Sequence, residues 1–202
     1  MKQLWNERYN DSEYIYGTEP NAYFKEKITP LTPGRLLLPA EGEGRNAVFA
    51  AKLGWAVTAF DWSIKAQAKA IMLAEVNQVE IDYWLSEVED LNFEVGSFDA
   101  VAFIYAHFSA ELKSAYNRKI ATFLKPGGVL IFEAFSKKQS EYQQTQHSGG
   151  PQDRAMLYSL EEVRADFADF HFLELEEKEV FLAEGPKHHG LGSVIRALAT
   201  KR

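Results

Sequence analysis

Residues 35–61 read RLLLPAEGEGRNAVFAAKLGWAVTAFD, and this stretch decides the fold. Its opening apolar run, residues 35–40, predicts a buried strand, and the acidic, glycine-bearing residues 41–46 predict a tight loop. Residues 47–53 predict a helix, after which a second apolar strand closes on Asp61. Strand, glycine loop, helix, strand and carboxylate in this order form half of a nucleotide-binding βαβ unit.

The loop residues predict which ligand groups this unit can hold. Gly42 and Gly44 lack a Cβ, so the backbone can turn sharply and let a ligand approach closely. The backbone amides around Asn46 open the helix and favour an anionic group such as a carboxylate. At the end of the second strand, Asp61 can accept hydrogen bonds from both hydroxyls of a ribose.

The charge of the loop separates two candidate cofactors. The pattern Gly42-x-Gly44-x-x-Ala47 also fits the dinucleotide fingerprint in its glycine/alanine form. Glu41 and Glu43 flank the glycines, so a pyrophosphate there would meet two like charges. A cationic ligand with an amino group and a sulfonium would not. The loop therefore favours S-adenosylmethionine over NAD.

With this loop, the chain resembles the class I S-adenosylmethionine-dependent methyltransferases, and among them the small tellurite-resistance and thiopurine methyltransferase-like group. The first motif of the class usually reads apolar, Asp, apolar, Gly, x, Gly, x, Gly; here Leu38 replaces the acid and Ala40 the first glycine. The resemblance covers nearly the whole chain and implies S-adenosyl-L-methionine as the cofactor. It also implies a Rossmann-like three-layer αβα sandwich around a mostly parallel seven-stranded sheet with a C-terminal antiparallel hairpin.

Composition limits the class of protein. The 202 residues suit one domain with a substantial core, and 46% hydrophobic with 25% charged residues is ordinary for a globular chain. No apolar run reaches membrane-span length and the start lacks a signal-peptide core, so we expect a cytoplasmic protein without a membrane partner. The sequence contains no cysteine, which excludes disulfides and thiolate sites, and its net charge of −7 argues against a nucleic-acid partner.

An aromatic arm precedes the first strand. We expect residues 1–34 to form this N-terminal arm and residues 35–202 to form the S-adenosylmethionine-binding methyltransferase domain. The patterns W-x-x-R-Y at 5–9 and Y-G-x-x-P-N at 16–21 resemble the arm that folds over the cofactor as a lid in the methyltransferase group. The alternative is a helix whose aromatic side chains pack on the core.

The rest of the chain predicts alternating strands and helices, followed by a hairpin. The expected strands are 79–85, 97–104 and 129–135 after a turn at 125–128; the expected helices are 64–76 capped by Ser63, 110–124 capped by Ser109, and one that begins with a capping box at Ser159. Residues 136–157 indicate a mobile loop over the site. The runs 172–181 and 192–199 should pair antiparallel, as in the methyltransferase architecture.

The ligand should lie beyond the carboxyl ends of the strands, where open α/β sheets bind theirs. Tyr105 and His107 follow the fourth strand and are the predicted catalytic residues, and Arg154 and His188 are predicted to bind the substrate. The resemblance implies that Glu87 and the amide of Val88 hold the adenine. The full set of expected cofactor contacts is Trp5, Arg8, Tyr9, Tyr16, Glu41, Gly42, Gly44, Asn46, Asp61, Trp62, Ser63, Glu87, Val88 and Tyr105.

Methyl transfer from a sulfonium requires a positioned nucleophile and the exclusion of water. The resemblance implies a small, soft acceptor: a thiol, a thiopurine or a metalloid oxyanion. We expect this acceptor to be anionic, and His107 to orient it or take its proton. The anionic preference rests on cationic side chains of the segments that should cover the site, namely Arg8, Lys137, Lys138, Arg154 and His188.

Two other functions stay open: a non-catalytic module with a methyltransferase fold, and a nicotinamide-dependent oxidoreductase. We expect no metal site, because adjacent histidines such as His188 and His189 point to opposite faces of an extended strand. The expected partner is a small-molecule substrate, and the expected assembly is a monomer or a homodimer.

Overall fold

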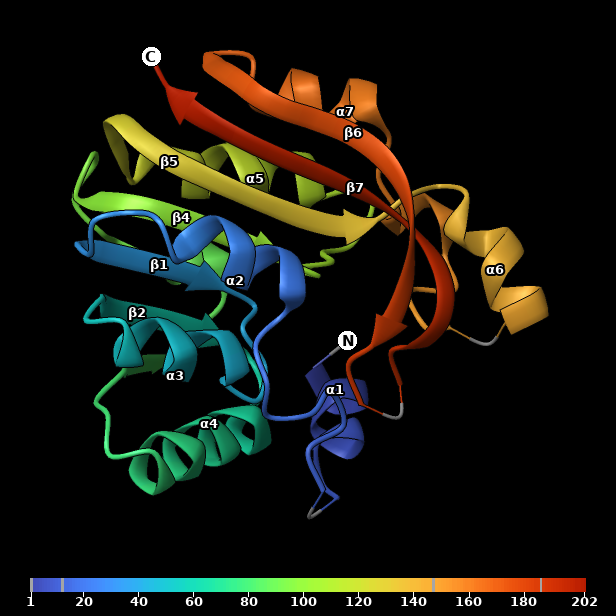
Figure 1. The fold of residues 1–202 in the computed structure, drawn as a ribbon, viewed down its shortest axis with the longest axis horizontal. Helices are drawn as coiled ribbons and strands as arrows, with labels where there is room; N and C mark the ends of the chain where they lie inside the picture. Colours follow the sequence, from blue (N-terminus) through green and yellow to red (C-terminus); the bar gives the residue numbers. More distant parts are fainter. Residues whose placement is uncertain (1, 12, 147, 186) are drawn as a thin grey trace.

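The computed structural model describes residues 2–11, 13–146, 148–185 and 187–202. It has a seven-stranded sheet in the order β3-β2-β1-β4-β5-β7-β6, with helices on both faces (Figure 1). The predicted Rossmann-like sandwich with a mostly parallel sheet and an antiparallel hairpin is therefore confirmed. His147 and Pro186, which belong to two of the predicted loops, lie outside the described residues.

The strands are β1 (Arg35–Pro39), β2 (Ala56–Asp61), β3 (Asp82–Leu85), β4 (Phe98–Ile104), β5 (Leu124–Phe135), β6 (Phe170–Ala183) and β7 (His189–Lys201). The α-helices are α1 (Lys2–Arg8), α2 (Ala22–Ile28), α3 (Arg45–Lys52), α4 (Ile64–Val76), α5 (Lys113–Thr122), α6 (Gln139–Gln146) and α7 (Leu160–Asp166), with 3-10 turns η1 (Val88–Asp90) and η2 (Arg154–Met156). Within the described ranges, no helix combines the length and the apolar character that crossing a bilayer requires.

The parallel half of the sheet is built around β1. This strand pairs with β2 on one side and with β4 on the other, so the strand order reverses between β1 and β4. Leu36, Leu37 and Leu38 are fully buried, as expected for a strand covered on both faces. The carboxyl ends of β1, β2 and β4 therefore meet beside the reversal, which is where such sheets bind their ligands.

Two hydrophobic clusters hold the helices on opposite faces of the sheet (Figure 1). On one face, Phe24 of α2 packs in a cluster with Ala50 of α3 and Ala70 of α4. On the other, Ile120 of α5 and Val163 of α7 share a second cluster. Because α2 contributes to the core, the second half of the predicted arm is tied to the sheet; the boundary at residue 34 stays a prediction.

The two runs predicted to pair antiparallel do so as β6 and β7. Strand β7 lies between β5 and β6 and is antiparallel to both. The turn that joins β6 to β7 packs against the arm, because a Cβ on Gly185 would lie 2.5 Å from the carbonyl oxygen of Ile15.

Two predicted helix starts are confirmed and one is wrong. Ser63 accepts a hydrogen bond from the backbone of α4, and Ser159 forms a capping box with Glu162. Ser109 does not cap α5, which begins at Lys113. The carbonyl of Ser109 instead accepts the N–H groups of Leu112 and Lys113, so a separate turn precedes the helix.

The structure also corrects one predicted turn and one predicted loop. The turn at 125–128 is an irregular part of β5, where the register against β4 shifts between Phe98 and Ala100. The predicted loop 136–157 contains α6 and η2. Its sequence lacks apolar periodicity because polar contacts hold α6: the fully buried Gln139 accepts the N–H of Ser193 in β7 at 2.8 Å.

Candidate active site

A cavity of about 330 Å³ lies at the carboxyl ends of β1, β2 and β4. The predicted residues that line it are Trp5, Arg8, Tyr9, Tyr16, Glu41, Asn46, Asp61, Trp62, Tyr105, His107 and His188. The lining residues without a predicted role are Ala40, Glu43, Arg45, Ile104, Phe135, Gly150, Pro151, Gln152 and Met156. The arm, the glycine loop and the end of β4 thus meet at one site.

Asp61 ends β2 with its carboxylate buried against the glycine loop. The backbone N–H of Ser63 donates to its Oδ1 at 2.9 Å, and that of Gly42 donates to its Oδ2 at 3.2 Å. Burial raises the pKa of Asp61 to about 6, although these backbone hydrogen bonds oppose the rise. The carboxylate is therefore ionised at neutral pH, with capacity on each oxygen to accept a further ligand hydroxyl.

Glu41 occupies the N-terminus of α3. Its Oε1 accepts the backbone N–H of Asn46 at 2.9 Å and of Ala47 at 2.8 Å. The expectation that these amides are free for an anionic ligand group is therefore wrong, because a carboxylate of the chain itself satisfies them. Burial raises the pKa of Glu41 to about 7, against the effect of these hydrogen bonds, so its charge changes near neutral pH.

The two glycines of the loop allow other parts of the protein to pack closely against the backbone. Both have positive φ, 66° at Gly42 and 87° at Gly44. A Cβ on Gly44 would lie 2.6 Å from the Cβ of Ala70 in α4, and one on Gly42 would lie 2.8 Å from the hydroxyl oxygen of Tyr9. Both glycines are required for this packing, neither is among the residues that line the cavity, and their predicted role in cofactor approach stays a prediction.

Stacked side chains of the arm cover the cavity. The rings of Trp5 and Tyr9 stack with centroids 5.4 Å apart, and the guanidinium of Arg8 lies 4.6 Å from the centre of the Trp5 ring. Arg8 also donates to the hydroxyl of Tyr16 at 3.3 Å. Tyr9 is only 5% exposed. This arrangement is compatible with the predicted lid, which stays a prediction.

Asn21 fastens the arm to distant parts of the chain. Its Nδ2 donates to Glu133 of β5 at 2.6 Å and to Glu184 of the β6–β7 turn at 2.8 Å. Its backbone N–H donates to Asn46 of the glycine loop at 2.9 Å. Arg45 then pairs with Glu184 at 2.7 Å, so the glycine loop, the arm and the turn form one polar network.

Tyr105 and His188 form the wall beside the end of β4. Their ring centroids are 4.6 Å apart, and His188 also packs on Tyr16 at 4.5 Å. The Nδ1 of His188 lies 3.6 Å from the carboxylate of Glu184. Burial lowers the pKa of His188 and Glu184 opposes this effect, so the imidazole is neutral at pH 7. Tyr105 has φ 53°, and Ala40 at the end of β1 has φ 49°, so backbone strain adjoins the cavity.

His107 is held by backbone groups on both ring nitrogens. Its Nδ1 lies 3.3 Å from the carbonyl oxygen of Met156, and its Nε2 accepts the N–H of Phe135 at 3.4 Å. Burial lowers its pKa to about 4. These contacts and the lowered pKa disfavour His107 as a proton acceptor, and its predicted role in orienting the acceptor stays a prediction.

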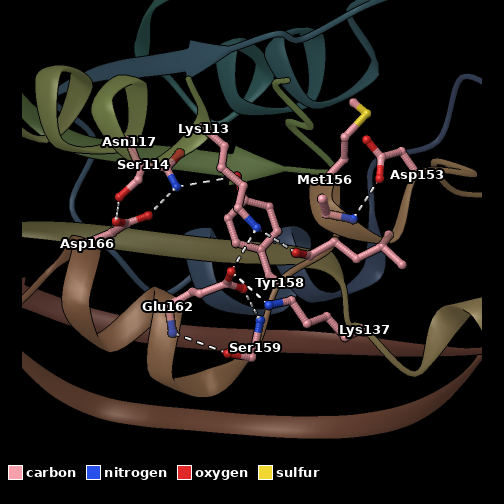
Figure 2. A network of polar contacts seen from close by, with 12 residues as sticks. Lys113, Ser114, Asn117, Lys137, Asp153, Met156, Tyr158, Ser159, Glu162 and Asp166 are labelled. Carbon is pink, nitrogen blue, oxygen red and sulfur yellow. Dashed lines mark hydrogen bonds and ion pairs between the residues drawn. The ribbon is translucent and has the colours of Figure 1, made fainter. Parts of the chain in front are cut away.

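A buried ammonium group fixes the segment that carries Met156 (Figure 2). The Nζ of Lys113 donates to the carbonyl of Leu157 at 2.7 Å and lies 4.8 Å from the centre of the Tyr158 ring. Lys113 also pairs with Glu162 at 3.2 Å, and the same carboxylate pairs with Lys137 at 2.8 Å. This network holds the Met156 wall of the cavity against α5 and α7.

The cations predicted to attract an anionic acceptor have other partners. Lys137 pairs with Glu162, and Lys138 pairs with Glu177 at 2.5 Å. Arg154 is exposed and donates to the carbonyl of Lys137 at 3.4 Å, outside the cavity. For these three residues, a contribution to acceptor binding stays a prediction.

Acidic side chains dominate the charge of the cavity. Three carboxylates, Glu41, Glu43 and Asp61, line it, and of these Glu43 pairs with Lys69 at 2.7 Å. The two lining arginines differ, since Arg45 pairs with Glu184 whereas Arg8 has no carboxylate partner among the described residues. The cavity therefore suits a cationic ligand that also carries one carboxylate.

Three more predicted cofactor residues lie outside the cavity lining. Ser63 is fully buried, and its hydroxyl donates to Asn6 at 2.7 Å as well as capping α4. Val88 is buried in the core, and neither it nor Glu87 lines the cavity. The adenine role of these two residues stays a prediction.

Some lining residues had a usable sequence signal and others did not. Phe135 ends β5, so the rule that placed Tyr105 at the end of β4 could also have found it. Gly150, Pro151 and Met156 reach the cavity only through the tertiary contacts of their segment, which no local pattern announces.

Comparisons with known proteins agree with this geometry. Residues 37–132 match the sequence family described as a methyltransferase domain. A ubiquinone biosynthesis O-methyltransferase from Xanthomonas axonopodis pv. citri is 31% identical over 121 residues, which are 59% of this chain and 50% of that protein. The chain thus spans about half the length of the curated relatives it matches.

Solved structures share the fold across nearly the whole chain. TehB from Haemophilus influenzae superposes with a TM-score of 0.72 at 17% identity, over 100% of this chain and 67% of that one. A structure described as an S-adenosylmethionine-dependent methyltransferase from Methanosarcina mazei gives a TM-score of 0.69 at 18% identity, over 91% of this chain and 98% of that one. At such identities the likeness shows the fold.

Proposed function

We propose that this chain is an S-adenosylmethionine-dependent methyltransferase that methylates a small thiol or hydroxyl acceptor, since residues 37–132 match the sequence family described as a methyltransferase domain. The observation that carries the proposal is the acid-lined cavity at the switch point of the sheet, with Asp61 at the end of β2. When bound there, the cofactor supplies an electrophilic methyl group on a sulfonium. The residues of the cavity bind the cofactor and the acceptor and take up the proton that the acceptor releases.

The residues present fit this cofactor. Each oxygen of Asp61 accepts one backbone N–H and can accept a ribose hydroxyl as well. The excess of carboxylates suits the positive charge of the sulfonium. Since Glu41 closes the N-terminus of α3, the amino-acid carboxylate of the cofactor needs another partner, and Arg8 is the lining cation without a carboxylate partner among the described residues.

His188 is the proposed proton acceptor. It lines the cavity, is neutral because burial lowers its pKa, and its Nδ1 faces Glu184 at 3.6 Å. That carboxylate would hold the imidazole in one orientation and stabilise its protonated form. A thiol acceptor, which ionises readily, needs this help less than a hydroxyl does.

The range of acceptors combines two lines of support. The resemblance to the tellurite-resistance and thiopurine methyltransferase-like group favours thiols, thiopurines or metalloid oxyanions. The name of the Xanthomonas relatives, ubiquinone biosynthesis O-methyltransferase, favours a hydroxyl instead. We place neutral thiols and phenols first, because the cavity lacks the cationic surroundings predicted for an anionic acceptor.

Calorimetry with S-adenosylmethionine, S-adenosylhomocysteine and NADH is the first test. We expect the first two to bind and NADH not to bind. Asp61→Asn should weaken binding about tenfold to a hundredfold, the equivalent of a charge-assisted hydrogen bond of about 1.5–3 kcal/mol. The exposed Glu94→Gln removes one charge elsewhere and should leave the affinity unchanged.

Transfer of labelled methyl to a panel of thiols, thiopurines, phenols, selenite and tellurite is the second test. Binding of the cofactor without transfer to any acceptor would favour the non-catalytic module. Binding of NADH alone would overturn the proposal in favour of the oxidoreductase.

A further inference from the structure

A second cavity, of about 300 Å³, lies between residues 16–20 of the arm and residues 180–185 at the end of β6. Of the described residues, Tyr16 and Tyr105 line both cavities and no other residue does. The two tyrosines are therefore a partition between the second cavity and the one proposed to hold the cofactor.

The first cavity has room for one ligand. Pockets for drug-sized ligands hold roughly 300–1,000 Å³. At about 330 Å³, the first cavity is at the lower end of this range, and a nucleoside with an amino-acid arm would fill it. An acceptor must then lie in adjoining space, and the second cavity adjoins at Tyr105.

The polar floor of the second cavity carries charges that cancel. Glu133 is 1% exposed and accepts hydrogen bonds from the Nε of Arg196 and from Asn21. Glu184 is likewise paired with Arg45, and the remaining lining carboxylate, Glu19, is exposed to solvent. A charged acceptor would leave a net charge here without a partner. Among the described residues, the terminal nitrogens of Arg196 have no hydrogen-bond acceptor, so they can donate to a neutral oxygen or ring nitrogen.

The walls of the second cavity favour a flat, apolar body. They include the rings of Tyr16 and Tyr105 together with Val180 and Leu182. The Tyr105 hydroxyl is buried beside the Glu133 carboxylate without a hydrogen bond of good geometry among the described residues, and its backbone is held at φ 53°. An unpaired buried hydroxyl on a strained residue is costly to the free protein, and a ligand with a polar edge would relieve that cost.

We propose that the second cavity binds the methyl acceptor, an uncharged planar aromatic compound whose hydroxyl or thiol faces the Tyr16–Tyr105 partition. This inference rests on the proposed function and deepens it. Arg196 meets the polar edge of the ring, and the hydroxyl or thiol approaches the cofactor at the partition, whose two rings lie 4.5 and 4.6 Å from the ring of His188.

Fluorine NMR with 4-fluorophenol as the probe tests this assignment on the full chain. With S-adenosylhomocysteine saturating the first cavity, we expect the probe still to bind. Thr18→Trp and Ala183→Trp, at exposed positions on opposite walls of the second cavity, should each weaken probe binding at least tenfold and leave S-adenosylhomocysteine affinity within twofold. Glu94→Trp adds the same side chain to a distant exposed site and should change neither.

The outcomes separate the two proposals. Displacement of the probe by S-adenosylhomocysteine would put the acceptor in the first cavity and overturn the inference. So would an absence of probe binding at millimolar concentration, or unchanged probe binding in both tryptophan variants that retain S-adenosylhomocysteine. If the wild-type chain does not bind S-adenosylhomocysteine at all, the proposed function itself is overturned.

Discussion

The hydroxyl oxygen of Tyr9 lies 2.8 Å from the point where a Cβ on Gly42 would stand. Gly42→Ala should therefore destabilise the fold by more than the 1–2 kcal/mol or so that a positive φ alone costs, and should also displace Tyr9 and weaken S-adenosylhomocysteine binding. Urea unfolding and calorimetry measure the two effects. Gly127→Ala is the matched control, since Gly127 has φ 77° and nothing within 4 Å of its added Cβ. Equal effects in the two variants would contradict the contact.

Arg8 should bind the amino-acid carboxylate of the cofactor. We expect Arg8→Gln to weaken S-adenosylhomocysteine binding about tenfold to a hundredfold, since a charge-assisted hydrogen bond is worth about 1.5–3 kcal/mol. Its affinity for 5′-methylthioadenosine, which lacks the amino-acid arm, should not change. Arg154→Gln, at an exposed arginine outside the cavity, serves as the control. An equal loss for both ligands would assign Arg8 to the packing of the arm instead.

His107 should make stability depend on pH. Its pKa falls from 6.5 to about 4 on folding, so the unfolded chain binds the extra proton between these values. The contribution of neutral His107 to the free energy of unfolding is therefore fully present above about pH 6.5. As the pH falls toward 4, the free energy of unfolding decreases by up to about 3 kcal/mol. Urea unfolding from pH 4.5 to 8 should show this slope as the difference between wild type and His107→Gln.

Two other groups also titrate in this pH range, so the effect of His107 must be measured as the difference between wild type and His107→Gln. Glu41 and Asp61 have raised pKa values, about 7 and about 6, so their effect on stability runs in the opposite direction over the same pH range. His171→Gln, at an exposed histidine, should follow the wild-type profile. A His107 ring signal that titrates near pH 6.5 in proton NMR would refute the assignment.

Ala40 stands in the left-handed region with φ 49°, where the related motif usually has glycine. Ala40→Gly should relieve this strain, while the added glycine increases the entropy of the unfolded chain and offsets part of the gain. The net effect should raise the free energy of unfolding by up to about 1 kcal/mol. Gly127→Ala measures how much a positive φ alone lowers the free energy of unfolding, because nothing lies within 4 Å of the added Cβ. A destabilised Ala40→Gly variant would show that the Ala40 methyl packs usefully in the cavity wall.

Local chemistry made much of the fold predictable. Gly54 ends α3, Ser63 caps α4, and Ser159 with Glu162 opens α7; each signal lies within a few residues of the feature it predicts. Asp61 was placed at the site for the same reason, because a strand end in a βαβ unit has a known position.

Contacts between distant residues were beyond such reasoning. Nothing near Gly42 indicates that Tyr9 will lie against it, and Lys113 and Leu157, 44 residues apart, meet only in the folded chain. The partners of the cations predicted near the site could not be predicted for the same reason. Lys137 and Lys138 belong to the segment predicted to cover the site, but their pairing with Glu162 and Glu177 depends on α7 and β6.

The place of β7 between β5 and β6 has a consequence for how the chain is made. Strand β6 pairs only with β7 in the sheet of the described residues, so its 14 residues cannot join the sheet until residues 189–201 have done so. Unpaired strand edges are prone to associate with one another in newly made chains. The charged side chains in residues 174–179, reading ELEEKE, disfavour such association of β6, both before it pairs and as the edge strand of the finished sheet.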